Sequence, residues 1–188
     1  MNKTLIIFLI LLATIQLHSQ DCKFFKPGST VFNRAENIIG EKLTSHTKQK
    51  TIYSKFKNKD NGLISLAAND DHYFFRLSLV RQYSNRFKIT KDEILEIVFD
   101  DESSVKLKSF GLYEGKGALT SFTMDAFYVL TKEQLDKLAL LPIKSLKIYF
   151  ISDTVTQFES DESGKYLRYD ILSENYKNNA LELARCIQ

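Results

Sequence analysis

The chain has 188 residues and a formal net charge of +3, with 26 Lys and Arg against 23 Asp and Glu. This near balance does not favour a nucleic-acid partner, because proteins that bind nucleic acid concentrate positive charge. Fourteen Phe and nine Tyr provide enough apolar surface for a sizeable core. The sequence contains no low-complexity tract and no repeat of fixed period.

The chain begins with a short positive segment followed by an apolar one. Lys3 precedes the uncharged stretch 4–17, which runs into polar residues at 18–20. A membrane-spanning helix needs about 20 apolar residues, so this shorter stretch is typical of a secretory signal peptide. We therefore expect residues 1–20 to be cleaved and the protein to be exported. Its destination would be the periplasm or the outside of the cell, with no transmembrane segment left after signal removal.

Cys22 follows the expected cleavage site and raises the alternative of a lipid anchor. Ser19, Gln20 and Asp21 precede it, whereas a lipoprotein signal has small and apolar residues at these positions. We therefore favour cleavage and release over lipidation.

The sequence contains two cysteines, Cys22 and Cys186, near the two ends of the exported chain. Disulfides persist in oxidising compartments outside the cytoplasm, so an even pair predicts one bridge. A reactive thiol is the alternative. We favour the bridge because neither cysteine lies in a C-x-x-C pair or beside a histidine.

Residues 21–188 are expected to form a single domain, whose first part contains one helix and then strands. Apolar residues at helical spacing predict a helix within 31–43. Asn61-Gly62 is typical of a hairpin turn between the first two strands. Period-two alternation of apolar residues then predicts strands at 51–56, 62–67, 73–81, 93–99, 104–110 and 121–130.

The last third of the chain contains two helices. Thr131 and Gln134 form a capping box for the first helix, which Pro142 ends. Strands are expected at 146–150 and 166–172, and Ser173 is expected to cap a last helix. The order is therefore strand, helix, strand, strand, helix. The prediction is an α+β domain with a mainly antiparallel sheet and helices packed on one face.

Two segments carry a resemblance to known proteins. "LTKEQLDKLALLPIKSLKIYFI" (130–151) and "NNALELARCIQ" (178–188) resemble the C-terminal third of small exported proteins from Bacteroidetes-type bacteria. The resemblance implies a bacterial, exported protein. It implies no particular activity and no functional residues.

No combination of residues in the sequence requires a catalytic site. The exported chain has two histidines, His46 and His72, and it lacks a G-x-S-x-G motif. His72 follows Asp70 and Asp71 in an expected turn, whose composition needs no functional explanation. The acidic residues within 92–102 are interpreted as a solvated turn and strand edge rather than paired catalytic carboxylates. We predict no catalytic residues, no metal ligands and no cofactor.

Three functions remain open. The first is a non-catalytic exported domain that binds a protein or a glycan at the cell envelope, through binding residues that are unknown. An aromatic patch among residues 53–87 would be its contact surface. The second is a carrier of a small apolar ligand under the sheet, which the fourteen Phe motivate. The third is a hydrolase that uses His72 with Asp70 or Asp71.

Overall fold

The computed structural model of the protein describes residues 22–51, 61–82, 87–114, 121–150 and 158–188. These residues form three helices and one ten-stranded antiparallel sheet, so the fold is α+β with a mainly antiparallel sheet. The helices are α2 (Thr30–Ile39), α3 (Lys132–Leu140) and α4 (Glu174–Ile187). The strands are β1 (Ser45–His46), β2 (Lys50–Thr51), β3 (Asn61–Ala68), β4 (Tyr73–Gln82), β5 (Ile94–Phe99), β6 (Ser104–Glu114), β7 (Ser121–Leu130), β8 (Ile143–Tyr149), β9 (Glu159–Asp161) and β10 (Gly164–Asp170).

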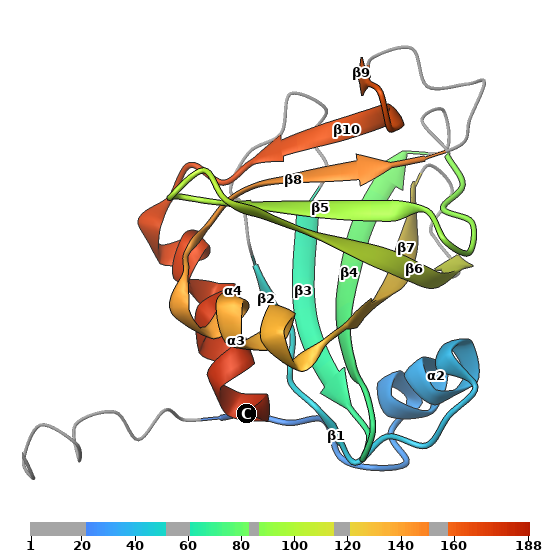
Figure 1. The fold of residues 1–188 in the computed structure, drawn as a ribbon. Coiled ribbons are helices and arrows are strands. Elements are labelled where there is room, and N and C mark those ends of the chain that lie inside the picture. Colours follow the sequence, from blue (N-terminus) through green and yellow to red (C-terminus); the bar gives the residue numbers. More distant parts are fainter. Residues whose placement is uncertain (1–21, 52–60, 83–86, 115–120, 151–157) are drawn as a thin grey trace, which may run out of the picture.

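The sheet is strongly curled. Its strands follow the order β1-β3-β4-β7-β6-β5-β8-β10-β9, and β2 also pairs with β3. Figure 1 shows that β3, β4 and β7 run across the direction of β5, β8 and β10, so two halves of one sheet cross. Register shifts occur at Val98/Phe99 in β5 and at Ser109/Gly111 in β6. Such irregularities increase the local twist of a strand and bend it.

Apolar side chains fill the space between the two halves. The inward residues predicted for β4 and β5 are at most 2% exposed and belong to one core cluster: Phe75, Leu77, Leu79, Leu95, Ile97 and Phe99. Burial of a side chain of this size contributes about 1.5–3 kcal/mol. The period-two alternation therefore predicted the inner face of these strands correctly.

Helices α3 and α4 pack against this same core. The predicted capping box is present, because Thr131 Oγ1 accepts from Gln134 N at 3.2 Å and Gln134 Oε1 accepts from Thr131 N at 2.9 Å. Ser173 stands at the N-cap of α4, but its side chain makes no capping hydrogen bond. Leu183 and Ala184 of α4 enter the core. Helix α4 contacts β2 and β3 in one half of the sheet and β8 in the other, so it spans both halves.

Helix α2 packs on the opposite face of the sheet, so the prediction that all helices lie on one face is wrong. The buried side of α2 forms a second core cluster that includes Phe74 of β4 and Phe127 of β7. Phe74 and Phe75 are neighbours on β4, and neighbouring strand residues point to opposite faces. Phe74 therefore points to the outer face of β4, together with buried Arg76 and Ser78, and α2 covers this face.

Two further local predictions are wrong. In chain order, β9 comes between β8 and β10, where no strand was predicted. Three strands rather than two therefore separate α3 from α4 in the sequence. The three residues of β9 are polar and exposed, and pairing with β10 alone defines it. Asn61 and Gly62 pair with β4 within β3 rather than forming a turn, although β2 and β3 do pair antiparallel, as a hairpin requires. Residues 52–60, which precede Asn61, lie outside the described residues.

A disulfide joins Cys22 to Cys186 and confirms the predicted bridge. It ties the first described residue to the last turn of α4, across 164 positions of sequence. Phe25 N donates to His46 O at 2.8 Å, which adds this segment to the edge of the sheet at β1. The Cys22 sulfur is bonded to Cys186, so it has no valence left for a thioether to a lipid. The expected signal peptide, residues 1–20, lies outside the described residues. None of the described helices is long and apolar enough to cross a membrane.

Replacing both Cys22 and Cys186 by serine should lower the free energy of unfolding by about 3–5 kcal/mol, because the bridge closes a very long loop in the unfolded chain. Urea unfolding of the oxidised protein and of the double variant measures this difference. The wild-type protein under reducing conditions is the matched control and should behave like the variant. Equal midpoints for the oxidised protein and the double variant would show that the bridge does not stabilise the fold.

Candidate functional site

A polar pocket of about 260 Å³ lies on the outer face of the sheet half that contains β5, β6, β8 and β10. We call it the outer pocket. Residues that alternate with the buried core residues of these strands supply most of its lining. The lining residues are Glu96, Val98, Glu102, Ser104, Lys144, Ser145, Lys147 and Arg168.

Short side chains from three adjacent strands form the floor of the outer pocket. Val98 of β5 pairs in register with Ser104 of β6 on one side and with Ser145 of β8 on the other. Side chains at directly opposite positions of neighbouring strands lie side by side on one face. A row of three short side chains among long ones therefore leaves a hollow.

Long charged side chains form the wall beside this floor. Glu96 of β5 lies opposite Lys106 of β6 and Lys147 of β8, and Lys147 lies opposite Arg168 of β10. These four residues make a charged ladder across four strands. Lys147 Nζ lies 3.0 Å from Glu96 Oε2, and Ser104 Oγ donates to Glu96 Oε1 at 2.9 Å.

Glu96 is 9% exposed, although it carries a charge. Burial by itself would raise the pKa of Glu96, but hydrogen bonds from Lys147 and Ser104 and the positive charges of Lys147 and Lys106 outweigh this effect. They hold the pKa of Glu96 below its ordinary value. The hydrogen bond to Glu96 in turn raises the pKa of Lys147. Glu96 therefore stays ionised and is a hydrogen-bond acceptor, which makes it unsuited to act as a general acid.

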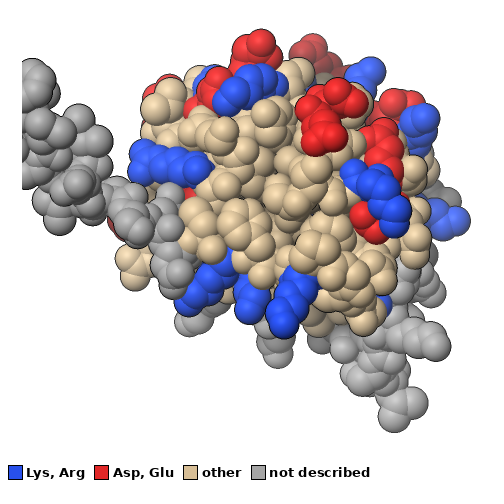
Figure 2. All heavy atoms as spheres, turned by 90° about the horizontal axis from the view of Figure 1, so that it is seen from below, with Lys and Arg blue, Asp and Glu red and all other residues tan. Residues whose placement is uncertain are grey.

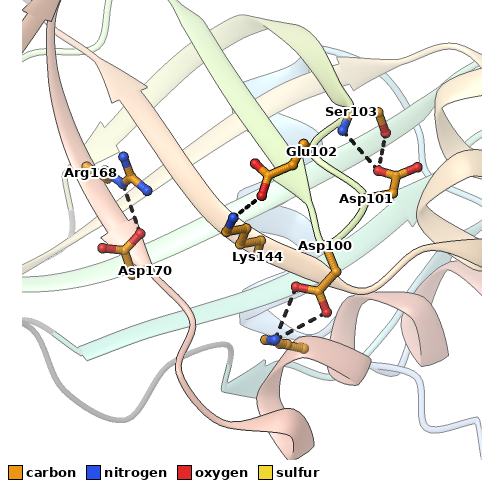
Figure 3. Close-up of polar contacts among 8 residues, drawn as sticks. Asp100, Asp101, Glu102, Ser103, Lys144, Arg168 and Asp170 are labelled. Atoms are coloured by element: carbon orange, nitrogen blue, oxygen red, sulfur yellow. Dashed lines mark hydrogen bonds and ion pairs between the residues drawn. The ribbon is translucent and has the colours of Figure 1, made fainter.

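The turn between β5 and β6 forms the rim of the outer pocket (Figure 3). Asp101 Oδ1 accepts hydrogen bonds from both the backbone N and the hydroxyl of Ser103, which fixes the turn. Glu102 has a φ of 64°, and its carboxylate pairs with Lys144 of β8. Asp100 pairs with Lys177 of α4 at 3.1 Å. The rim is therefore held by contacts with both β8 and α4.

The prediction from sequence missed this site. Among its residues only Glu96 and Glu102 had been considered, as part of a solvated turn and strand edge. Glu96 instead lies on a central strand, because β5 has β6 and β8 on either side. One feature of the sequence could have indicated the site. Each of three predicted strands has a charged residue between two apolar ones, namely Glu96, Lys147 and Arg168.

The residues of the hydrolase hypothesis do not form a comparable site. His72 is 51% exposed, and its Nδ1 lies 3.6 Å from Glu41 Oε2. Asp70 and Asp71 are exposed as well. None of the three lines the outer pocket. An exposed turn offers a substrate little shelter from water, so the geometry gives the hydrolase hypothesis no support.

His46 belongs to a buried polar cluster on the other half of the sheet. Its Nε2 lies 3.0 Å from Ser65 Oγ, which is the spacing of a nucleophile and its base. Both residues are fully buried, so no substrate reaches them. Beside them, Arg76 and Asp125 form an ion pair at 2.9 Å and are at most 5% exposed. The cluster therefore joins β1, β3, β4 and β7 and has a structural role.

The predicted aromatic patch among residues 53–87 is largely internal where the structure describes it. Phe74, Phe75 and Phe87 are buried, and Tyr73 is half-buried. The aromatic residues within 52–60 and 83–86 lie outside the described residues. The described part of this segment thus offers no exposed aromatic surface.

Charge is distributed without a dominant sign on the face seen in Figure 2. Lys, Arg, Asp and Glu lie around the margin of this face, and its centre is uncharged. Nucleic-acid binding requires a continuous basic surface, which this face does not provide. Among the described residues, no three His, Cys, Asp or Glu side chains are grouped so that they could hold a metal ion.

Comparison of the chain with models of protein families, with curated proteins and with solved structures gave no match.

Stability should depend on pH through His46. Burial, and secondly the positive charge of Arg76, lowers the pKa of His46 to about 3 in the folded protein, against about 6.5 in an unfolded chain. Between these values the unfolded state binds a proton that the folded state does not. The free energy of unfolding should therefore fall by about 1.4 kcal/mol per pH unit as the pH drops below 6.5.

Urea unfolding at pH 7, 6 and 5 measures this slope in a range where most carboxylates remain ionised. His46→Gln should be less stable at pH 7 but should lose the slope, whereas His72→Gln, at an exposed position, should retain it. A His46→Gln protein with the slope of the wild type would show that another group causes the pH dependence.

Proposed function

We propose that the protein is an exported, non-catalytic binding domain of the bacterial cell envelope that binds a glycan in the outer pocket. One observation supports a glycan most directly, namely the mixture of groups in the wall. Glu96 and Glu102 carry acceptors only, whereas Lys147 and Arg168 carry donors only. A sugar hydroxyl both donates and accepts hydrogen bonds, so it complements a surface on which the two kinds of group alternate.

The size of the outer pocket agrees with this ligand class. Complete small-molecule sites have volumes of about 300–1,000 Å³, and the outer pocket has about 260 Å³. It suits one sugar unit of a longer chain, the remainder of which would lie over the exposed strands. An apolar ligand is a poor fit here, because charged groups would lose water without gaining hydrogen bonds.

A protein partner has less support in the described residues. Protein interfaces commonly depend on aromatic residues in a central, exposed position. The described aromatic residues within 73–87 are buried or half-buried instead. For this reason we place the glycan before the protein among the two partners expected from the sequence.

Export is supported by two independent features. The N-terminal 20 residues have the pattern of a secretory signal. The Cys22–Cys186 disulfide is of a kind that persists in the periplasm or outside the cell and is rare in the cytosol.

A carrier of a small apolar ligand is the second candidate, and one observation favours it. The hydroxyls of Tyr128 and of Ser109, its register partner on β6, are buried without a hydrogen-bond partner among the described residues. Burial raises the pKa of Tyr128 further above its ordinary value, so its hydroxyl remains a donor. A ligand with an apolar body and one polar group would satisfy such hydroxyls.

The carrier hypothesis can be tested on protein recovered from its native export route. Organic extraction followed by mass spectrometry would identify a bound apolar ligand. One equivalent of a lipid-like molecule would favour this second candidate over the glycan. Extracts that contain no such molecule would count against it.

Filling the outer pocket should weaken glycan binding. Val98→Trp places an indole over the floor and should weaken binding roughly tenfold or more, a loss of at least about 1.4 kcal/mol. Ile94→Trp is the matched control, because Ile94 lies on the same face of β5 but does not line the outer pocket. A glycan array identifies the ligand, and isothermal titration calorimetry then measures affinity for all three proteins.

Thermal unfolding checks that both tryptophan variants fold. Equal affinity of the Val98→Trp variant and the wild type would place the glycan elsewhere on the surface. Absence of binding to every glycan on the array would overturn the proposed function.

A further inference from the structure

We infer that the sugar unit held in the outer pocket carries a carboxylate, and that Arg168 is the residue that binds this group. The inference rests on the proposed function and names the class of sugar, an acidic one such as a uronic acid. It depends on the way in which the cations of the outer pocket are already paired.

Arg168 presents open donors to the outer pocket. Its Nε donates to Asp170 Oδ1 at 2.9 Å, and its side chain is 40% exposed. The two terminal amino groups of its guanidinium make no hydrogen bond to any described residue. Figure 3 shows Asp170 on one side of the guanidinium. Both residues are on β10, which pairs with β8, the strand that carries Lys144.

The other two cations that line the outer pocket are occupied. Lys144 pairs with Glu102. Lys147 pairs with Glu96 at 3.0 Å and lies 3.9 Å from Asp161. An incoming anion would have to displace a carboxylate from either lysine. Arg168 binds one without displacement, because its hydrogen bond to Asp170 uses only Nε.

The geometry of the guanidinium matches a carboxylate. Its planar arrangement of N–H groups donates two parallel hydrogen bonds to the two oxygens of a carboxylate, and such charge-assisted pairs are among the strongest polar contacts. Because Nε already donates to Asp170, the two terminal nitrogens would donate these two parallel hydrogen bonds. Asp170 opposes the anion electrostatically, but it also fixes the orientation of the guanidinium and so reduces the entropy lost on binding.

The remaining groups suit the rest of an acidic sugar. Glu96 and Glu102 accept hydrogen bonds from ring hydroxyls, and the serines of the floor offer hydroxyls of their own. The lining residues carry three cations and two carboxylates, and Asp170 adds a third carboxylate beside Arg168. The contribution of Arg168 to binding therefore comes from the open N–H groups of its guanidinium rather than from an excess of positive charge.

The test compares three probes of equal chain length: a trigalacturonate, its methyl ester and the neutral galactose trimer. Isothermal titration calorimetry with the wild type should give an affinity for the trigalacturonate roughly tenfold above that for the methyl ester. Arg168→Gln should remove this preference, so that the variant binds the trigalacturonate and its methyl ester with similar affinity. Arg168→Lys should retain only part of the preference. The positive charge remains, but lysine cannot donate two parallel hydrogen bonds from a planar group.

Lys165→Gln is the matched control. Lys165 is an exposed cation on the same strand, its Nζ lies over the ring of Phe158, and it does not line the outer pocket. This variant should keep the full preference. Raising the salt concentration should weaken binding of the trigalacturonate more than binding of its ester.

The outcomes separate the inference from the proposed function. Equal affinities for the acid and its ester would overturn the acidic sugar but leave the glycan. A preference for the acid that survives in Arg168→Gln would overturn the assignment of its carboxylate to Arg168. Binding of a peptide through its C-terminal carboxylate, with no affinity for any of the three sugars, would overturn both. A stronger preference for a sulfated trimer that Arg168→Gln abolishes would overturn the carboxylate in favour of another oxyanion.

Discussion

The fold depends on α4, because this helix joins two halves of a sheet whose end strands do not pair with each other in the described part of the chain. Strands β1 and β9 stand at opposite ends of the strand order, and α4 contacts β2 and β3 in one half and β8 in the other. Its buried side completes the core between the halves. Cys186 ties its last turn to Cys22, and Arg185 Nε donates to Ala139 O of α3 at 3.0 Å. Without this helix, the apolar space between the halves would be open to water on one side.

The same helix determines the rim of the outer pocket. Lys177 of α4 pairs with Asp100, the residue that begins the turn carrying Glu102. Just before α4, Ile171 N donates to Lys144 O at 2.9 Å, and Lys144 is the partner of Glu102. Both members of this rim pair are therefore positioned from α4. A pocket whose walls stand on paired strands and whose rim is fixed loses little conformational entropy when a ligand binds.

The features predicted correctly from the sequence are those that a short segment or the residue composition determines. Alternation identified the inner residues of β4 and β5, the Thr131–Gln134 pair identified the start of α3, and cysteine number identified the bridge. The place of α2 was missed because Phe74 shares the outer face of β4 with Arg76 and Ser78, and a mixed polar face is typical of a strand face exposed to solvent, although all three residues are buried. The outer pocket was missed for a different reason. Its floor exists only because Ser104, Val98 and Ser145 come into register, and register between distant strands cannot be derived from the sequence of each strand alone.

The two halves of the outer face differ in one respect that bears on function. On β3, β4 and β7, α2 covers the outer face, and Arg76 and Asp125 form an ion pair beneath it, away from water. On β5, β8 and β10, no described helix covers the outer face, and the two ends of the charged ladder, Lys106 and Arg168, are exposed to solvent. Burying a charged ladder would be costly, whereas exposing it leaves donors and acceptors free to exchange water for a ligand. The uncovered half is therefore the part of the sheet that can bind a polar ligand without unfolding.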